Sequence, residues 1–91
     1  MSAPEAAEDG DAVRRRRLKF RAWHRGMREV DLILGRFADA SVDGMDEAEL
    51  SAFEALLDEP DPEILSWVTG QTPVPGDSKN KLVHQLIAFY R

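Results

Sequence analysis

The sequence predicts an all-α fold, a small bundle of about five helices. Apolar residues recur at spacings of three and four along five segments, as on the buried face of a helix. No segment shows the period-two alternation of a half-buried strand. Glycine and proline residues separate the segments, as expected for short connections between helices. A chain of 91 residues has room for one such domain.

The chain is divided into an acidic tail and one helical domain. Residues 1–12 are small and acidic, include proline and glycine and contain nothing to bury, so we expect a disordered tail. The domain is expected to occupy residues 13–91.

The first helix is predicted over residues 13–24. Phe20, Trp23 and Met27 follow a helical spacing, and Val13 falls on the same stripe, which favours an inward orientation for these side chains. Gly26 then ends or bends the helix.

Four further helices are predicted, over residues 27–38, 45–57, 62–69 and 79–90. Asp46 and Glu49 resemble a capping box, a mutual hydrogen-bonding pair at a helix start. Asp61 is the expected N-cap of the fourth helix, and Gly70 its left-handed end. The predicted core includes Leu34, Phe37, Phe53, Leu57, Val68, Leu86 and Ile87, and Tyr90 is expected to face inward from the last helix.

Composition excludes several classes of protein. The chain has no cysteine and two histidines, which excludes a disulfide framework, a thiolate metal site and a zinc cluster. No apolar run approaches the roughly 20 residues that span a bilayer. We therefore expect a soluble protein in a reducing compartment, without membrane insertion.

The net charge of −5 is unevenly distributed. Between Val13 and Arg36 lie nine lysine and arginine residues against two acidic residues, whereas the remainder is strongly acidic. This asymmetry predicts a basic binding face on an acidic body.

The run Arg14, Arg15, Arg16 and Arg17 allows two interpretations. With interleaved aromatic residues it could bind phosphates and stack on bases, which would indicate a small nucleic-acid-binding or regulatory protein. Alternatively the aromatic residues belong to the core and the arginines form a solvated face that steers an acidic partner. Helical spacing and the acidic remainder favour the second interpretation, without nucleic acid as a partner.

No catalytic or metal-binding pattern is present. None of the serines lies in a recognisable nucleophile context. The acidic stretch at residues 39–47 does not follow the spacing of a calcium-binding loop.

The segment HRGMREVD, residues 24–31, places a glycine inside an otherwise helical pattern. Arg25 and Glu29 are four apart, so they could pair on a continuous helix while Gly26 serves only as a terminator. A glycine costs about 1 kcal/mol inside a helix, however, and it permits a positive φ or the close approach of another backbone. The second interpretation is a place where a partner docks, and the residues alone support both.

Two segments of the chain resemble sequence motifs of one known family. The segment RGMREVD, residues 25–31, resembles the Arg-Gly-x-x-Glu motif of the succinate dehydrogenase assembly factors that promote covalent FAD attachment, the SdhE family. The segment FEALLDEPDPEILSWV, residues 53–68, resembles the second signature of that family. The resemblance extends over about residues 13–90, with both motifs in the family's order.

The resemblance implies a five-helix bundle that acts as a chaperone. Such a protein binds the flavoprotein subunit of succinate dehydrogenase or fumarate reductase and promotes attachment of FAD to a histidine of that subunit, without being an enzyme itself. Arg25, Gly26 and Glu29 match the signature, and Met27 and Asp31 match its common extension, so these five are the expected partner-binding residues. No cofactor of its own is implied, since the FAD is bound to the partner.

The resemblance and the tail also suggest where the protein works. The acidic tail lacks the arginine-rich composition of a mitochondrial transit peptide, which leads us to expect a bacterial, cytoplasmic member of the family. The free protein is expected to be a monomer.

Overall fold

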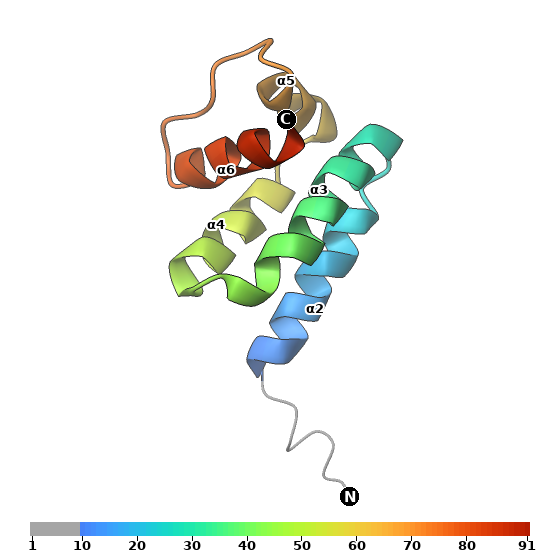
Figure 1. Cartoon of the computed structure of the whole chain (residues 1–91), viewed down its shortest axis with the longest axis vertical. Coiled ribbons are helices and arrows are strands. Elements are labelled where there is room, and N and C mark those ends of the chain that lie inside the picture. The colour runs from blue at the N-terminus through green and yellow to red at the C-terminus, as the bar shows by residue number, and fades with distance from the viewer. Residues whose placement is uncertain (1–9) are drawn as a thin grey trace, which may run out of the picture.

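The computed structural model describes residues 10–91, which form five α-helices and one short 3-10 turn (Figure 1). The elements are α2 (Gly10–Trp23), α3 (Arg28–Ser41), η1 (Val42–Gly44), α4 (Glu47–Leu57), α5 (Asp61–Val68) and α6 (Asn80–Tyr90). No strand occurs in this part of the chain, and the predicted all-α class is confirmed. The tail prediction concerns mainly residues 1–9, which lie outside the described range.

Helix α3 is the centre of the bundle. It runs beside α2 in the opposite direction, and it also contacts α5 and α6 (Figure 1). Helix α4 packs on α2 and α6, so α6 is held between α3, α4 and α5. None of the helices at residues 10–91 is long and apolar enough to cross a membrane.

The core prediction is confirmed for six of its seven residues. Leu34, Phe37, Phe53, Leu57, Val68 and Leu86 are buried. Ile87 is only partly buried and packs against this core. The inward orientation predicted for Tyr90 is wrong, since its side chain is 52 % exposed. Tyr90 lies in the last turn of α6, where it borders an open groove instead of the core.

The inward face of α2 differs from the predicted stripe. Leu18 and Ala22 are buried, whereas Phe20 is 64 % exposed and stacks on the ring of His24 at a centroid distance of 4.0 Å. The predicted stripe ran through Phe20 and Trp23, which both lie within α2, whereas the buried face runs through Leu18 and Ala22. Phe20 is two positions away from each of these buried residues and therefore lies on the opposite side of the helix, so its predicted inward orientation is wrong.

A glycine in α3 determines how closely α2 and α3 pack. A Cβ atom at Gly35 would lie 2.2 Å from the nearest atom of the Trp23 indole ring. The partly buried indole therefore rests directly on the backbone of α3, and its Nε1 donates a hydrogen bond to Asp39 at 3.2 Å. Contact of a large ring with a side-chain-free position lets the two helices approach.

The helices begin and end close to their predicted residues, and two of these ends have the caps that the sequence indicated. The capping box at the start of α4 is confirmed: the Glu49 amide donates to Asp46, and the Asp46 amide donates to the Glu49 side chain. Gly70 ends α5 with a φ of +80°, as predicted. Helix α2 begins at Gly10, so residues 10–12 are helical and the helix starts before its predicted first residue, Val13.

Helix α5 begins one residue before its predicted start. Pro60 occupies the N-cap position, and Asp61 is the first helical residue. The capping role predicted for Asp61 is therefore wrong. Its side-chain carboxylate has another partner, described below.

Candidate functional site

The turn between α2 and α3 carries the first of the two motifs. Helix α2 ends at Trp23 and α3 begins at Arg28, so residues 24–27 lie between the helices. Gly26 has a φ of +119°, a backbone conformation that side-chain-bearing residues rarely adopt. The glycine is therefore required by the conformation of the turn, which reverses the chain between two packed helices.

The side chain of Arg25 turns back into the molecule. Its Nε donates to Asp61 at 2.8 Å, and its Nη2 donates to the Glu59 carbonyl at 2.5 Å. Its Nη1 donates to the Leu57 carbonyl. In this ion pair the Arg25 and Asp61 side chains are only 12 % and 11 % exposed.

The ion pair that Arg25 was considered to form with Glu29 is absent. That interpretation required a continuous helix through both residues, and the chain leaves the helix between them. Arg25 instead fastens the α2–α3 turn to the segment between α4 and α5.

Two carboxylates fix the backbone of the turn. Asp31 accepts hydrogen bonds from the amides of Arg25, at 2.6 Å, and Gly26, at 3.3 Å. Asp61 accepts one from the amide of Met27 at 3.3 Å. These amides precede α3, where negative charge is favoured by the helix dipole. The turn is thus held by side chains on both of its sides.

The five expected partner-binding residues divide into two groups. Arg25 and Asp31 are engaged in holding the turn, and the Met27 side chain packs against the core. Gly26 and Glu29 are exposed. Within residues 10–91 the Glu29 side chain forms no hydrogen bond or ion pair, so it is available to a partner. Binding of a partner by these residues stays a prediction.

Asp61 was missed as a site residue. It belongs to the second motif, where its position before Pro62 suggested only a helix cap. In the structure it connects the two motifs, because one carboxylate oxygen accepts from Arg25 and the other from Met27. The only signal in the sequence was the occurrence of both motifs together, which does not reveal a contact between them.

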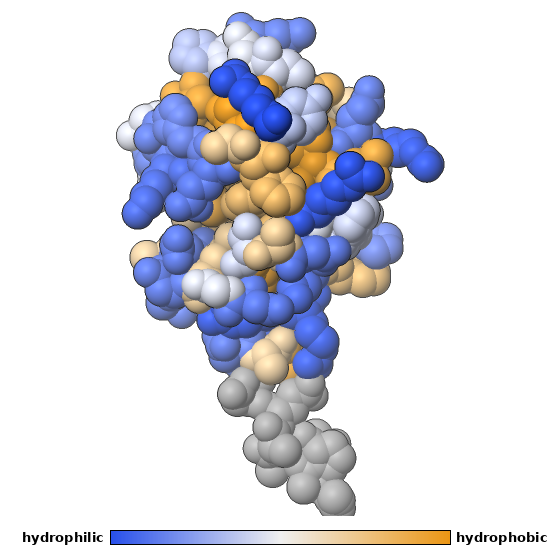
Figure 2. All heavy atoms as spheres, in the orientation of Figure 1, coloured by the Kyte–Doolittle hydropathy of each residue, from blue (hydrophilic) through white to orange (hydrophobic). Residues whose placement is uncertain are grey.

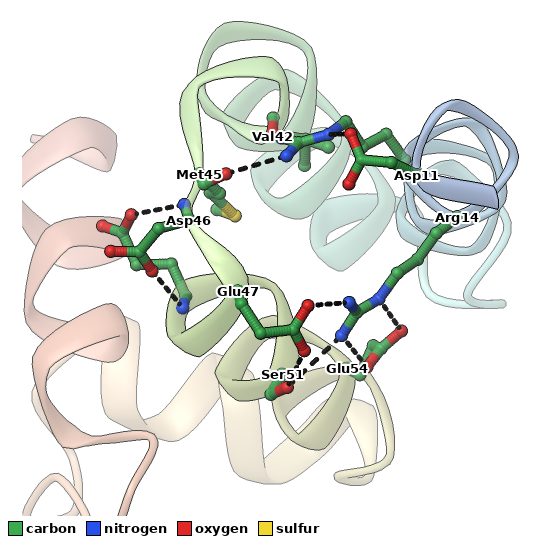
Figure 3. A network of polar contacts seen from close by, with 10 residues as sticks. Asp11, Arg14, Val42, Met45, Asp46, Glu47, Ser51 and Glu54 are labelled. Carbon is green, nitrogen blue, oxygen red and sulfur yellow. Dashed lines mark hydrogen bonds and ion pairs between the residues drawn. The ribbon is translucent and has the colours of Figure 1, made fainter. Parts of the chain in front are cut away.

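Arg14 and Arg15 of the arginine run bind other elements of the bundle, and Figure 3 shows the contacts of Arg14. Arg14 donates to Glu54 from Nε at 2.9 Å and from Nη2 at 2.8 Å, and to Glu47 at 2.6 Å. Arg15 pairs with Asp11 at 2.7 Å and donates to the carbonyl groups of Val42 and Met45. These two arginines join α2 to α4 and η1, so the solvated face expected for the whole run is not observed. Arg16 and Arg17 are exposed.

The contacts of Arg14 alter the acidity of its partners. Hydrogen bonds from its guanidinium group hold the pKa of Glu54 and the pKa of Glu47 below the ordinary range of a glutamate. The same bonds raise the pKa of Arg14. These shifts reflect a network between helices, and they do not indicate catalytic chemistry.

The nucleic-acid alternative receives little support from this geometry. Arg14 and Arg15 are occupied, so fewer cations remain for phosphates. The exposure of Phe20 does remove one argument against base stacking, because the aromatic residue is on the surface. One face of the Phe20 ring is, however, already stacked on His24 of the same chain.

A metal-binding cluster does not occur among the described residues. Among residues 10–91, no three or more His, Cys, Asp or Glu side chains come together in a way that could hold a metal ion. The described residues instead present an exposed glycine, Gly26, on a turn that is fixed from both sides, and an exposed carboxylate, Glu29, in the first turn of the following helix. Exposed residues on a rigid scaffold are typical of a small helical protein that binds a partner.

Comparison with known proteins specifies the family. Residues 16–90 match the model of the family Sdh5, described as "Flavinator of succinate dehydrogenase". The chain belongs to this family.

Three relatives illustrate the similarity. The FAD assembly factor SdhE of Acetobacter pasteurianus is 43 % identical over 86 residues, which cover 94 % of this chain and 79 % of the relative. The mitochondrial succinate dehydrogenase assembly factor 2 of Mycosarcoma maydis is 34 % identical over 97 residues, covering 100 % of this chain and 41 % of the relative. The mitochondrial succinate dehydrogenase assembly factor 2 of Debaryomyces hansenii is 40 % identical over 78 residues, which cover 82 % of this chain and 55 % of the relative. The chain thus spans about half the length of these two mitochondrial relatives.

Proposed function

We propose that this protein is an assembly factor that binds the flavoprotein subunit of succinate dehydrogenase, or of fumarate reductase, and promotes covalent attachment of FAD to a histidine of that subunit. The observation that carries the proposal is family membership together with an intact, rigidly held motif turn. The bacterial relative, matched over most of its length, is named an FAD assembly factor.

The proposed mechanism is conformational and involves no catalytic group of this chain. A binding protein can favour one state of its partner if it binds that state more tightly than the others. Holding the flavoprotein so that its histidine meets the flavin ring would accelerate bond formation through orientation. The FAD belongs to the partner, and neither His24 nor His84 of this chain is required.

The residues of the turn have different parts in this mechanism. Gly26 and Glu29 are exposed and are the proposed contacts with the flavoprotein. The nearly buried ion pair of Arg25 with Asp61 favours an anchoring role for Arg25, since its charge is already compensated within the bundle. Stabilisation of negative charge on the flavin would then come from groups of the flavoprotein itself.

The proposed compartment is the bacterial cytoplasm. This proposal rests on the bacterial relative, because the match covers 79 % of that relative's length, a larger share than for the two mitochondrial relatives. The expectation of a monomer without a nucleic-acid partner stays a prediction.

The test is flavin attachment to a purified apo-flavoprotein subunit, with FAD and with or without this protein. Covalent flavin is measured as fluorescence of the denatured subunit in a gel. We expect the wild type to accelerate attachment, and Gly26→Arg and Glu29→Ala to reduce the acceleration at least about tenfold, the loss of an interface hot spot.

Matched control variants separate docking from folding. Gly70 also has a positive φ and open space around it, so Gly70→Arg carries the same kind of backbone strain outside the motif. Glu63 is an exposed glutamate in the first turn of α5, as Glu29 is in α3, so Glu63→Ala removes a comparable charge. Equal losses in variant and control would contradict a specific role for the turn. A wild type without any effect on attachment would refute the proposed function.

A further inference from the structure

A groove opens where α3, α5 and the C-terminal end of α6 meet, and it has a volume of about 480 Å³. Its apolar lining comes from Leu32, Ile33 and Leu65 and from Phe89 and Tyr90 of α6. In Figure 2 apolar surface appears on this face, in the region where α3 meets α5 and the end of α6. The groove is therefore an apolar surface feature outside the motif turn.

The aromatic residues along the groove are unusually exposed. Only three large hydrophobic side chains are exposed within residues 10–91, and two of them are Phe89, at 46 %, and Tyr90, at 52 %. Phe89 also contacts the core ring of Phe37 edge-to-face, with centroids 5.6 Å apart, so it is fixed in place. Exposed apolar surface that is gathered in a concave site is typical of a binding surface.

Two side chains of opposite charge lie along the α3 side of the groove. Glu29 and Arg36 both line it, and they are seven residues, or two helical turns, apart. That spacing corresponds to about 10 Å along the helix axis. Neither side chain forms a hydrogen bond or ion pair with another residue of the described part of the chain. Both charges are therefore available to a partner.

Glu29 also belongs to the first motif, in the first turn of α3 directly after the motif turn, so the groove is continuous with the proposed flavoprotein contact. We propose that the groove receives an apolar side chain of the flavoprotein subunit. A basic residue of the same partner segment would meet Glu29, and an acidic residue would meet Arg36. In an extended segment, three to four residues cover about 10 Å, which sets the separation of these two partner charges. This inference rests on the proposed function and extends its contact surface.

The test measures binding of the purified flavoprotein subunit to the wild type and to groove variants. Tyr90→Ser removes an exposed ring at the groove, and Leu32→Gln makes its lining more polar. We expect each to weaken binding at least about tenfold. Phe20→Ser is the matched control, because Phe20 is the third exposed aromatic side chain and does not line the groove. The Kd of Phe20→Ser for the flavoprotein subunit should lie within about twofold of the wild-type Kd.

Arg36→Glu tests the charge pattern. This reversal should weaken binding, and exchange of the groove-facing acidic residue of the partner for lysine should restore it. A photo-cross-linking amino acid at position 90 identifies the partner segment, which should contain an apolar residue flanked by a basic and an acidic residue.

The binding measurements distinguish failure of the groove inference from failure of the proposed function. If the wild type binds and Tyr90→Ser binds equally well, the groove inference is overturned while the proposed function stands. If the wild type does not bind, both are overturned. Light scattering tests a second copy of this chain as the occupant, and a wild-type dimer that Tyr90→Ser abolishes would also overturn the inference. Thermal melting checks folding, and the exposure of Tyr90 keeps its variant informative even if Leu32→Gln unfolds.

Discussion

The two ends of α2 both connect that helix to the rest of the bundle through arginine, but in different ways. At the N-terminal end, Arg14 binds the carboxylates of Glu47 and Glu54, whose side chains are 76 % and 38 % exposed. Just beyond the C-terminal end, Arg25 binds Asp61 and two backbone carbonyl groups, and both charged side chains are nearly buried.

This difference determines how much each connection contributes to stability. Exposed ion pairs are screened by water and salt, and they contribute little individually. Removal of one partner from a buried pair leaves an uncompensated charge in a poorly solvated place, which is strongly destabilising. The C-terminal end of α2 is therefore the rigid end, and it is the end that carries the motif.

The largest expected effect is at the rigid end. Arg25→Ala should lower the free energy of unfolding by roughly 3 kcal/mol, because Asp61 and two carbonyl groups lose their donor. Urea denaturation measures the change. Combining it with Asp61→Ala should cost less than the sum of the two single changes, as for residues in direct contact. A loss below about 1 kcal/mol would show that the pair behaves like an exposed one.

The next effect concerns the packing of Trp23, the last residue of α2. Gly35→Ala should destabilise the fold by about 1–2 kcal/mol, since overpacking outweighs the gain in helix propensity. Gly44→Ala is the control, because a Cβ atom there meets nothing within 4 Å. Thermal melting of the two variants compares them. An unchanged melting temperature for Gly35→Ala would mean that the indole can move aside.

A smaller, salt-dependent effect is expected at the exposed end. Arg14→Gln should lower the melting temperature less than Arg25→Ala does, and the difference from the wild type should shrink as salt is added. Melting at low and high ionic strength measures this. An effect as large as that of Arg25→Ala, and insensitive to salt, would remove the distinction between the two ends.

The same network predicts a dependence on pH. The pKa values of Glu47 and Glu54 are lowered in the folded state by hydrogen bonds from Arg14. Their contribution is fully present above the ordinary glutamate pKa of about 4.3 and is lost as the pH falls through the lowered folded values. The wild type should therefore lose more stability than Arg14→Gln when the pH is lowered from about 5 to 3. Parallel acid profiles for the two proteins would contradict this assignment.

The smallest expected effect on stability is at Arg17, which is exposed on α2. Arg17→Gln should leave the melting temperature unchanged. If this charge steers an acidic partner, the variant should associate more slowly with the flavoprotein subunit at low salt, with little change in dissociation. Stopped-flow association measures both rates. Equal association rates at low ionic strength would leave Arg17 as a solvated residue.

The sequence by itself determined the fold class, the approximate helices and most of the core. Leu34, Phe37 and Phe53 were predicted inside because helical periodicity is a local property, and the helices that carry it are real. The capping box and Gly70 were also predicted correctly, since both depend on residues close in the chain. The two motifs were sufficient to indicate the family.

Tertiary structure alone decided which charged residues are partners and which are exposed. Arg25 and Asp61 are 36 positions apart, and Arg14 and Glu54 are 40 apart, so no local pattern relates them. Packing of α2 against α3 and α4 also decided which face of α2 is buried, and Phe20 lies on the other face. The buried face of a helix depends on how whole helices pack, which involves long-range contacts that a local sequence pattern does not specify.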